Sequence, residues 1–264
     1  MTTSTPPPRA SAPGPVLFAR YAYPPNALGY CGPGDPGGLL ERAAAGADLG
    51  GLGHLAARFE GAWPYLQLIA AANGLRDPLD PRVVRAYWVG NELVGRVPPA
   101  ALARSLADRF EHPAGRRLGA IVAPVPEGAV PHHSFHVFAV YPWLGLLRAG
   151  MEGAPMDVLE RCRIRWGTVE ALSGDLVLVR SRPLVFDGSR LDLGPARTEE
   201  VRRSVEGVGL AHDLVAGDTV SLHWDWVCDR LTPGELRWLR ACTRRNLDAV
   251  NATAAPGPAA ACGA

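Results

Sequence analysis

Hydrophobic periodicity changes its character about midway along this chain, and that change constrains the fold more than any other feature. Between residues 50 and 110, apolar residues recur at spacings of three and four, as on one face of a helix. From residue 158 onward, apolar and β-branched residues form short runs separated by Gly, Asp and Ser. We therefore predict an α+β chain, in which a mainly helical N-terminal domain precedes a small antiparallel β-barrel with a C-terminal helix.

Start and stop signals place the individual helices. An apolar face over residues 55–69 is interrupted by Pro64, which predicts either a kink or two helices, the second ending at Asn73-Gly74. Asp80-Pro81 and Pro98-Pro99 each predict a helix start. Residues 232–250 predict the final helix, because Thr232 and Glu235 have the spacing of a capping box.

The β-rich part divides into short segments. Strands are expected at residues 164–169, 176–179, 184–186, 191–193 and 219–222. Segments 24–26 and 31–34 combine Pro, Gly and Asn and predict loops. Periodicity does not decide the secondary structure of residues 113–147, because apolar runs there fit either strands or a helix that continues to Leu147.

Composition shifts suggest the domain boundaries. Residues 1–14 and 252–264 are rich in Pro, Ala, Ser and Thr and are expected to be disordered tails. Gly150–Pro155 resembles a linker, so the expected units are a helical domain at 15–155 and a β-barrel domain at 156–251. Each unit is expected to have its own core.

Composition also excludes several classes of function. The net charge of +1 gives no field that would attract nucleic acid or an anionic membrane. All 27 basic residues are arginine, which excludes Schiff-base and P-loop chemistry. The five cysteines are widely spaced without a CxxC pair, which disfavours disulfides and structural zinc and suits a cytoplasmic protein. The longest apolar run, at 137–147, is too short to span a membrane.

Two groups of residues are candidate metal ligands by chemistry alone. His132, His133 and His136 account for three of the seven histidines within five positions, and neutral imidazole binds zinc, iron, nickel or haem. Cys31 lies between glycines that would allow a ligand to approach closely. The alternatives are hydrogen-bonded or exposed histidines and a small buried thiol in a turn. Cys228 and Cys242 are expected to be packing residues, and Cys262 an incidental thiol in the tail.

A third candidate pair carries a resemblance to a known family. Residues at matching offsets, in the same order, are Cys162, Ile164, Gly167, Val169, Gly217, Asp218, Val220 and His223. This pattern, followed by a final helix, resembles the HypC-type hydrogenase-maturation chaperones over about residues 160–250. In that family the cysteine follows the initiator methionine, whereas Cys162 is internal.

The resemblance implies iron handling. The family carries iron bearing cyanide and carbon monoxide toward the large subunit of NiFe hydrogenase, with the cysteine holding the metal and the histidine assisting. Cys162 and His223 would then form an open iron site at one edge of the barrel. Arg161 and Arg163 could supply positive charge to the thiol, and Asp225 could orient His223. The alternative is a barrel of the same shape in which Cys162 is an inert core thiol.

The whole chain also resembles an uncharacterised actinobacterial family associated with NiFe-hydrogenase genes. The segments that carry this resemblance are FARYAYPPNALGYCGP, HHSFHVF and SLHWDWVCDRL. We therefore expect a maturation accessory protein that binds or delivers iron, or docks the hydrogenase large subunit or another maturation protein. The alternatives are an enzyme that binds haem or a metal such as zinc through the His132–His136 cluster, and a metal-free docking module.

Overall fold

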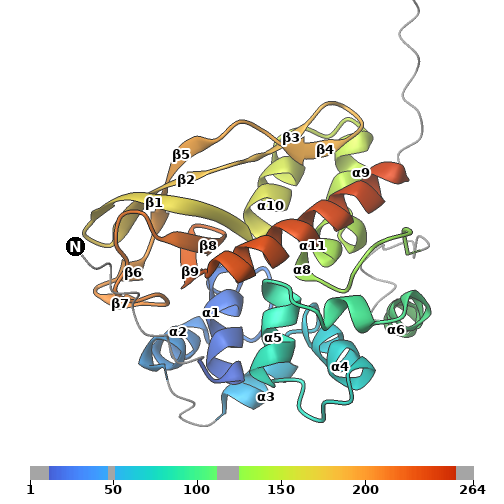
Figure 1. Cartoon of the computed structure of the whole chain (residues 1–264), viewed down its shortest axis with the longest axis horizontal. Coiled ribbons are helices and arrows are strands. Elements are labelled where there is room, and N and C mark those ends of the chain that lie inside the picture. The colour runs from blue at the N-terminus through green and yellow to red at the C-terminus, as the bar shows by residue number, and fades with distance from the viewer. Residues whose placement is uncertain (1–11, 47–50, 112–124, 254–264) are drawn as a thin grey trace, which may run out of the picture.

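The computed structural model describes residues 12–46, 51–111 and 125–253 (Figure 1). Most of both expected tails, Cys262 included, and the apolar segment 121–124 lie outside this range. The helices of the first half are α1 (Gly14–Ala27), α2 (Pro36–Ala45), α3 (Leu52–Ala57), α4 (Trp63–Ala72), α5 (Pro81–Trp88), the 3-10 helix η1 (Val94–Arg96) and α6 (Pro99–Glu111). They are followed by α8 (His133–Phe135), the π-helix η2 (His136–Val140), α9 (Trp143–Arg148) and α10 (Ala154–Cys162). The mainly helical first half is therefore confirmed.

Local capping explains several of these boundaries. Asp80 accepts a hydrogen bond from the Arg82 N–H at the start of α5, and Pro81 occupies the first turn. The expected interruption near Pro64 separates α3 from α4. The ambiguous segment around His136 is helical, and residues 136–140 form a π-helix, a distortion that is frequent at functional sites.

One expected loop is wrong. Pro24 and Pro25 lie inside α1, although proline removes backbone donors from a helix. Nearly every residue from Gly14 to Asn26 is buried, so tertiary packing outweighs the local helix-breaking signal. The turn predicted at residues 31–34 is present between α1 and α2.

The second half is a mixed β structure that ends in a long helix. Its strands are β1 (Arg165–Ser173), β2 (Leu176–Ser181), β3 (Leu184–Phe186), β4 (Leu191–Leu193), β5 (Arg197–Arg202), β6 (Ser204–Val205), β7 (Val208–Gly209), β8 (Thr219–His223) and β9 (Trp226–Arg230). Helix α11 (Pro233–Ala252) follows, and the Thr232–Glu235 capping box at its start is confirmed.

The main sheet returns to its first strand. Its hydrogen-bonded order is β1-β2-β5-β9-β8, and β8 pairs again with β1. The expectation that all pairs are antiparallel is wrong, because β5 and β9 run parallel where Arg202 pairs with Trp226. The tight turn between β8 and β9 makes these two strands antiparallel. The direction of β9 beside β5 is therefore set by β8. Sequence periodicity also missed β5, whose charged residues hide its alternation.

Three apolar clusters fill the described part of the molecule. The largest joins α1, α4 and α5 to residues of the second half, including Ile164, Trp226 and Leu239. A second lies among η2, α9, α10, β3–β4 and α11, and a third fills the inside of the main sheet. Helix α11 runs across the middle of the molecule, with α1, α4 and α5 on one side and α9, α10 and β3–β4 on the other (Figure 1). The largest cluster thus contains residues of both halves, and the expected domain boundary near residue 155 stays a prediction.

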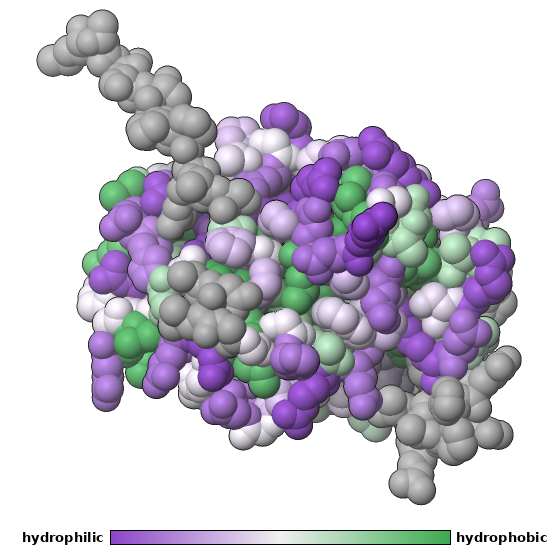
Figure 2. Space-filling model, turned by 90° about the horizontal axis from the view of Figure 1, so that it is seen from below, coloured by the Kyte–Doolittle hydropathy of each residue, from purple (hydrophilic) through white to green (hydrophobic). Residues whose placement is uncertain are grey.

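The surface is of mixed polarity. On the face shown in Figure 2, hydrophilic and hydrophobic residues are interspersed among the coloured residues. Within the described ranges, none of the helices combines the length and the apolar character that a membrane span requires.

Candidate metal centre

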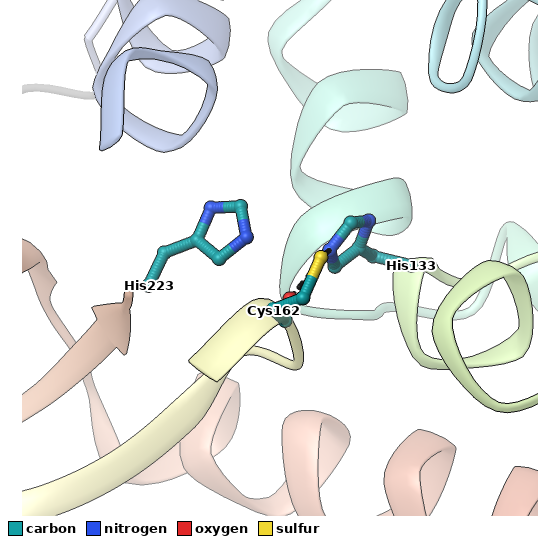
Figure 3. Close-up of side chains that lie close together, drawn as sticks. All are labelled: His133, Cys162 and His223. Atoms are coloured by element: carbon teal, nitrogen blue, oxygen red, sulfur yellow. Dashed lines mark hydrogen bonds between the residues drawn. The ribbon is translucent and has the colours of Figure 1, made fainter. Parts of the chain in front are cut away.

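Three potential ligands meet in the interior, at the ends of three different elements. His133 begins α8, Cys162 ends α10 and His223 ends β8. One donor atom from each lies within 4.8 Å of the other two, and all three residues are buried. Figure 3 shows the two imidazoles on either side of the Cys162 side chain. The structure therefore brings Cys162 and His223 together, as the resemblance to the HypC-type chaperones implied, and adds His133 from the helical half. We call these three residues the donor cluster.

His223 already has the tautomer that a metal ligand needs. Its Nδ1 lies 2.6 Å from the Tyr21 carbonyl, which can only accept, so the ring N–H must be on Nδ1. Nε2 then carries the lone pair, and this buried atom has no hydrogen-bond partner. Burial lowers the pKa of His223 well below its usual value, with a smaller contribution from His133. A backbone carbonyl that fixes the ring of a metal-binding histidine is a common arrangement.

His133 contacts both Cys162 and a tyrosine. Its Nε2 lies 2.8 Å from the Cys162 carbonyl and 3.9 Å from the Cys162 Sγ. Because the carbonyl accepts, Nε2 carries the proton, and Nδ1 accepts from the Tyr87 hydroxyl at 3.1 Å. Burial lowers the pKa of His133 to about 4, so the ring is neutral at pH 7. With a metal on Nε2, the His133 ring would carry its proton on Nδ1, and that N–H would donate a hydrogen bond to the Tyr87 oxygen.

One of the three separations is close to that between two ligands of a coordinated metal. Zinc-type bond lengths and tetrahedral angles place a sulfur and a nitrogen ligand about 3.6 Å apart. The observed 3.9 Å between the Cys162 Sγ and the His133 Nε2 is only slightly longer. Small shifts of side chains would thus bring these two ligands to a common ion.

Cys162 is a neutral thiol in the absence of a metal. Burial raises its pKa strongly, Cys31 adds to that effect, and the indole of Trp224 opposes it. The structure corrects the role expected for the flanking arginines: Arg163 pairs with Glu160 at 2.9 Å, and Arg161 lies 3.7 Å from Asp157. A bound cation would therefore be the main source of positive charge that ionises this thiol.

Asp225 does not orient His223. It lies 3.7 Å from the Arg202 guanidinium and is about half exposed, whereas the His223 N–H is directed at the Tyr21 carbonyl. The reason is the turn after β8, which directs Asp225 away from the interior. Sequence reasoning missed Tyr21 and Tyr87 as supporting residues, because a backbone carbonyl and a helix residue more than 40 positions away leave no local signal.

The other predicted ligands lie outside the donor cluster. His132 caps α8 by accepting from the Ser134 N–H, and burial lowers its pKa to about 3. The His136 ring lies 6.5 Å from the His133 ring, its Nδ1 faces the Tyr65 hydroxyl at 3.4 Å, and its buried Nε2 has no partner. Cys31 lies between α1 and α2, and burial raises its pKa to about 12.

Aromatic rings enclose the donor cluster. The Trp88 ring lies 4.6 Å from the His133 ring and 5.6 Å from the His223 ring, measured between centroids. The indole of Trp224 packs in the same apolar cluster as Cys162. Two surface cavities, of about 610 and 130 Å³, are lined by other residues, at α4–α6 and at β4–α11. The donor cluster thus lies in the interior, outside these two cavities.

Comparison with known proteins identifies the family. Residues 10–257 match the family of unknown function DUF6390. The chain belongs to this family. The match includes all three donor-cluster residues. Searches of curated proteins and of solved structures gave no match.

Proposed function

We propose that this chain binds one transition-metal ion at His133, Cys162 and His223 and acts as an accessory protein in NiFe-hydrogenase maturation. The observation that carries the metal site is the convergence of three buried, uncharged donor atoms from elements far apart in the sequence. The maturation role rests on the resemblance to the HypC-type chaperones, whose cysteine and histidine correspond to Cys162 and His223.

The donor set suits the metal that the resemblance implies. A thiolate is a soft ligand and imidazole is intermediate, a combination that binds iron, copper or zinc in preference to magnesium or calcium. With three protein ligands, the metal would keep coordination positions for further ligands. In iron that bears cyanide and carbon monoxide, these two ligands would occupy those positions, and the apolar surroundings would keep water from the metal.

Burial favours a protein that retains its metal over one that exchanges it quickly. Each of the three ligands is less than one tenth exposed, so transfer to the hydrogenase large subunit or to another maturation protein requires the site to open. The proposal therefore includes partner-dependent release.

A metal-dependent enzyme is the second candidate. Catalytic metal sites also use three protein ligands and keep a position for substrate. The same three ligands would carry that activity, with His136 nearby in place of the His132–His136 set expected from the sequence.

Metal analysis of protein purified without oxygen tests the proposal. We expect about one metal ion per chain, and loss of that metal in the variants Cys162→Ala and His223→Ala. Cys242→Ala is the matched control, because Cys242 is also a buried free thiol but lies against Gly90 in another part of the core. His212→Ala is the control for an exposed histidine.

The outcomes separate the hypotheses. Iron with infrared bands of cyanide and carbon monoxide would support the maturation role, whereas zinc or haem would favour the enzyme. Protein that is free of metal and does not bind iron(II), cobalt(II) or zinc(II) would contradict the metal site and leave a docking module.

A further inference from the structure

Trp224 holds an unusual position beside the donor cluster. Its φ is +53°, a left-handed conformation that is uncommon for a bulky residue. It follows His223 directly, in the turn between β8 and β9. Strained backbone of this kind persists only where the surrounding structure enforces it, and it is frequent at functional sites.

Two hydrogen bonds hold this backbone against the chain around Cys162. The Trp224 N–H donates to the Arg161 carbonyl at 2.7 Å, and the Trp224 carbonyl accepts from the Arg165 guanidinium at 2.7 Å. The turn is thus tied to the residue before Cys162. The indole consequently enters the apolar cluster that contains Cys162, where it is 4% exposed.

The indole N–H lacks a partner in this position. The Trp224 Nε1 is buried and makes no hydrogen bond, and a buried donor left unpaired costs about 1–3 kcal/mol. The Tyr30 ring packs against the indole with centroids 4.2 Å apart, which shields that side from water. A neutral thiol is a weak acceptor, but a thiolate is a strong one.

We propose that Trp224 is a positioning residue for the metal centre, whose indole N–H donates a hydrogen bond to the Cys162 sulfur once metal binding has converted the thiol to a thiolate. This inference rests on the proposed function. Each ligand then has its own support: Tyr21 for His223, Tyr87 for His133 and Trp224 for Cys162.

The test uses the full chain with zinc(II) and cobalt(II) as probes. In the ¹⁵N-labelled wild type, zinc should shift the Trp224 indole N–H resonance downfield, and Trp224→Phe identifies that resonance by its loss. In Trp224→Phe, cobalt affinity should fall about 10–100-fold, as for other residues that support metal ligands. The sulfur-to-cobalt charge-transfer band should move to lower energy, because the sulfur loses a hydrogen bond; a purely structural role would not shift it.

Trp226→Phe is the matched control, because it removes another buried indole from the same hairpin. It should leave the sulfur-to-cobalt charge-transfer band and the cobalt affinity unchanged. A metal-loaded wild type with the charge-transfer band but an unmoved Trp224 resonance would overturn this inference alone. Absence of metal binding to the wild type would overturn the proposed function as well. If Trp224→Phe folds poorly, triple-resonance assignment of the wild-type chain identifies the same resonance and keeps the test decisive.

Discussion

Two buried polar clusters lie beside each other along residues 160–165, and they differ in how their polar atoms are satisfied. In the ionic cluster, made of Glu160, Arg163, Arg165 and Glu199, each guanidinium faces a carboxylate. Arg163 pairs with Glu160 at 2.9 Å and Arg165 with Glu199 at 3.0 Å. Arg165 also donates to the Trp224 carbonyl. This cluster is complete without a ligand.

The donor cluster contains Cys162, which directly precedes Arg163, and some of its polar atoms have no hydrogen-bond partner. Its members are uncharged at pH 7, and both the His223 Nε2 and the neighbouring Trp224 Nε1 are buried without partners. Buried polar atoms in folded proteins are nearly always hydrogen-bonded. The two clusters thus differ in that the ionic cluster satisfies its charges internally, whereas the donor cluster leaves a nitrogen lone pair without a partner.

Acid should affect the donor cluster and its surroundings most. Burial lowers the pKa of His132, His133, His136 and His223, so each binds a proton in the unfolded chain before it does in the folded one. Their contribution to stability is complete above about pH 6.5 and is lost as the pH falls below it. Four such groups correspond to at most about 5 kcal/mol per pH unit. Urea unfolding between pH 7 and 4 measures this slope.

A flat stability curve over that range would contradict the burial of neutral histidines.

Metal should stabilise the protein through the donor cluster. A ligand at about 1,000 times its dissociation constant adds about 4 kcal/mol to the free energy of unfolding. We expect that gain with cobalt(II) in the wild type and its loss after chelation, measured by thermal unfolding. An equal gain in Cys162→Ala would place the metal elsewhere.

Breaking the ionic cluster should lower stability without removing the metal ligands. Arg165→Ala leaves Glu199 without its guanidinium, and removal of one buried partner costs about 3–5 kcal/mol. We expect a loss of stability of about 3 kcal/mol, at the lower end of that range, because the Glu199 side chain is 22% exposed. Arg197→Ala, an exposed arginine, should change stability by less than about 0.5 kcal/mol. Similar losses in the two variants would show that the ionic cluster contributes little.

Removing one hydroxyl should separate support of a ligand from general packing. Tyr87→Phe deletes the group that faces the His133 Nδ1, so metal affinity should fall about 10–100-fold. Tyr65→Phe deletes a buried hydroxyl that faces His136, outside the donor cluster, and should leave the affinity unchanged. Isothermal titration with zinc(II) measures the affinity of both variants. Equal zinc affinities in Tyr87→Phe and Tyr65→Phe would refute the proposal that Tyr87 supports His133 as a ligand.

The helix starts, the final capping box and the short strands at 184–186 and 191–193 were predictable, because each depends on contacts within a few residues. The buried prolines of α1 and the parallel pairing of β5 with β9 were not, because distant packing decides them. Of the candidate site, Cys162 and His223 could be paired only through the resemblance to the HypC-type chaperones. His133 could be named as a candidate, but its cluster with His132 and His136 gave no sign that His133 alone would face Cys162.

By itself, the sequence determined the α+β class, the donor chemistry of thiol and imidazole, and the absence of lysine chemistry. Those properties follow from residue type and local spacing. Tertiary structure alone decided which donors meet, which carbonyl fixes the His223 ring, and that Trp224 packs in the same apolar cluster as Cys162. The physical reason is that a metal site is defined by separations of a few ångströms between residues that are 29 to 90 positions apart in the chain, and packing of α8, α10 and β8 sets those separations.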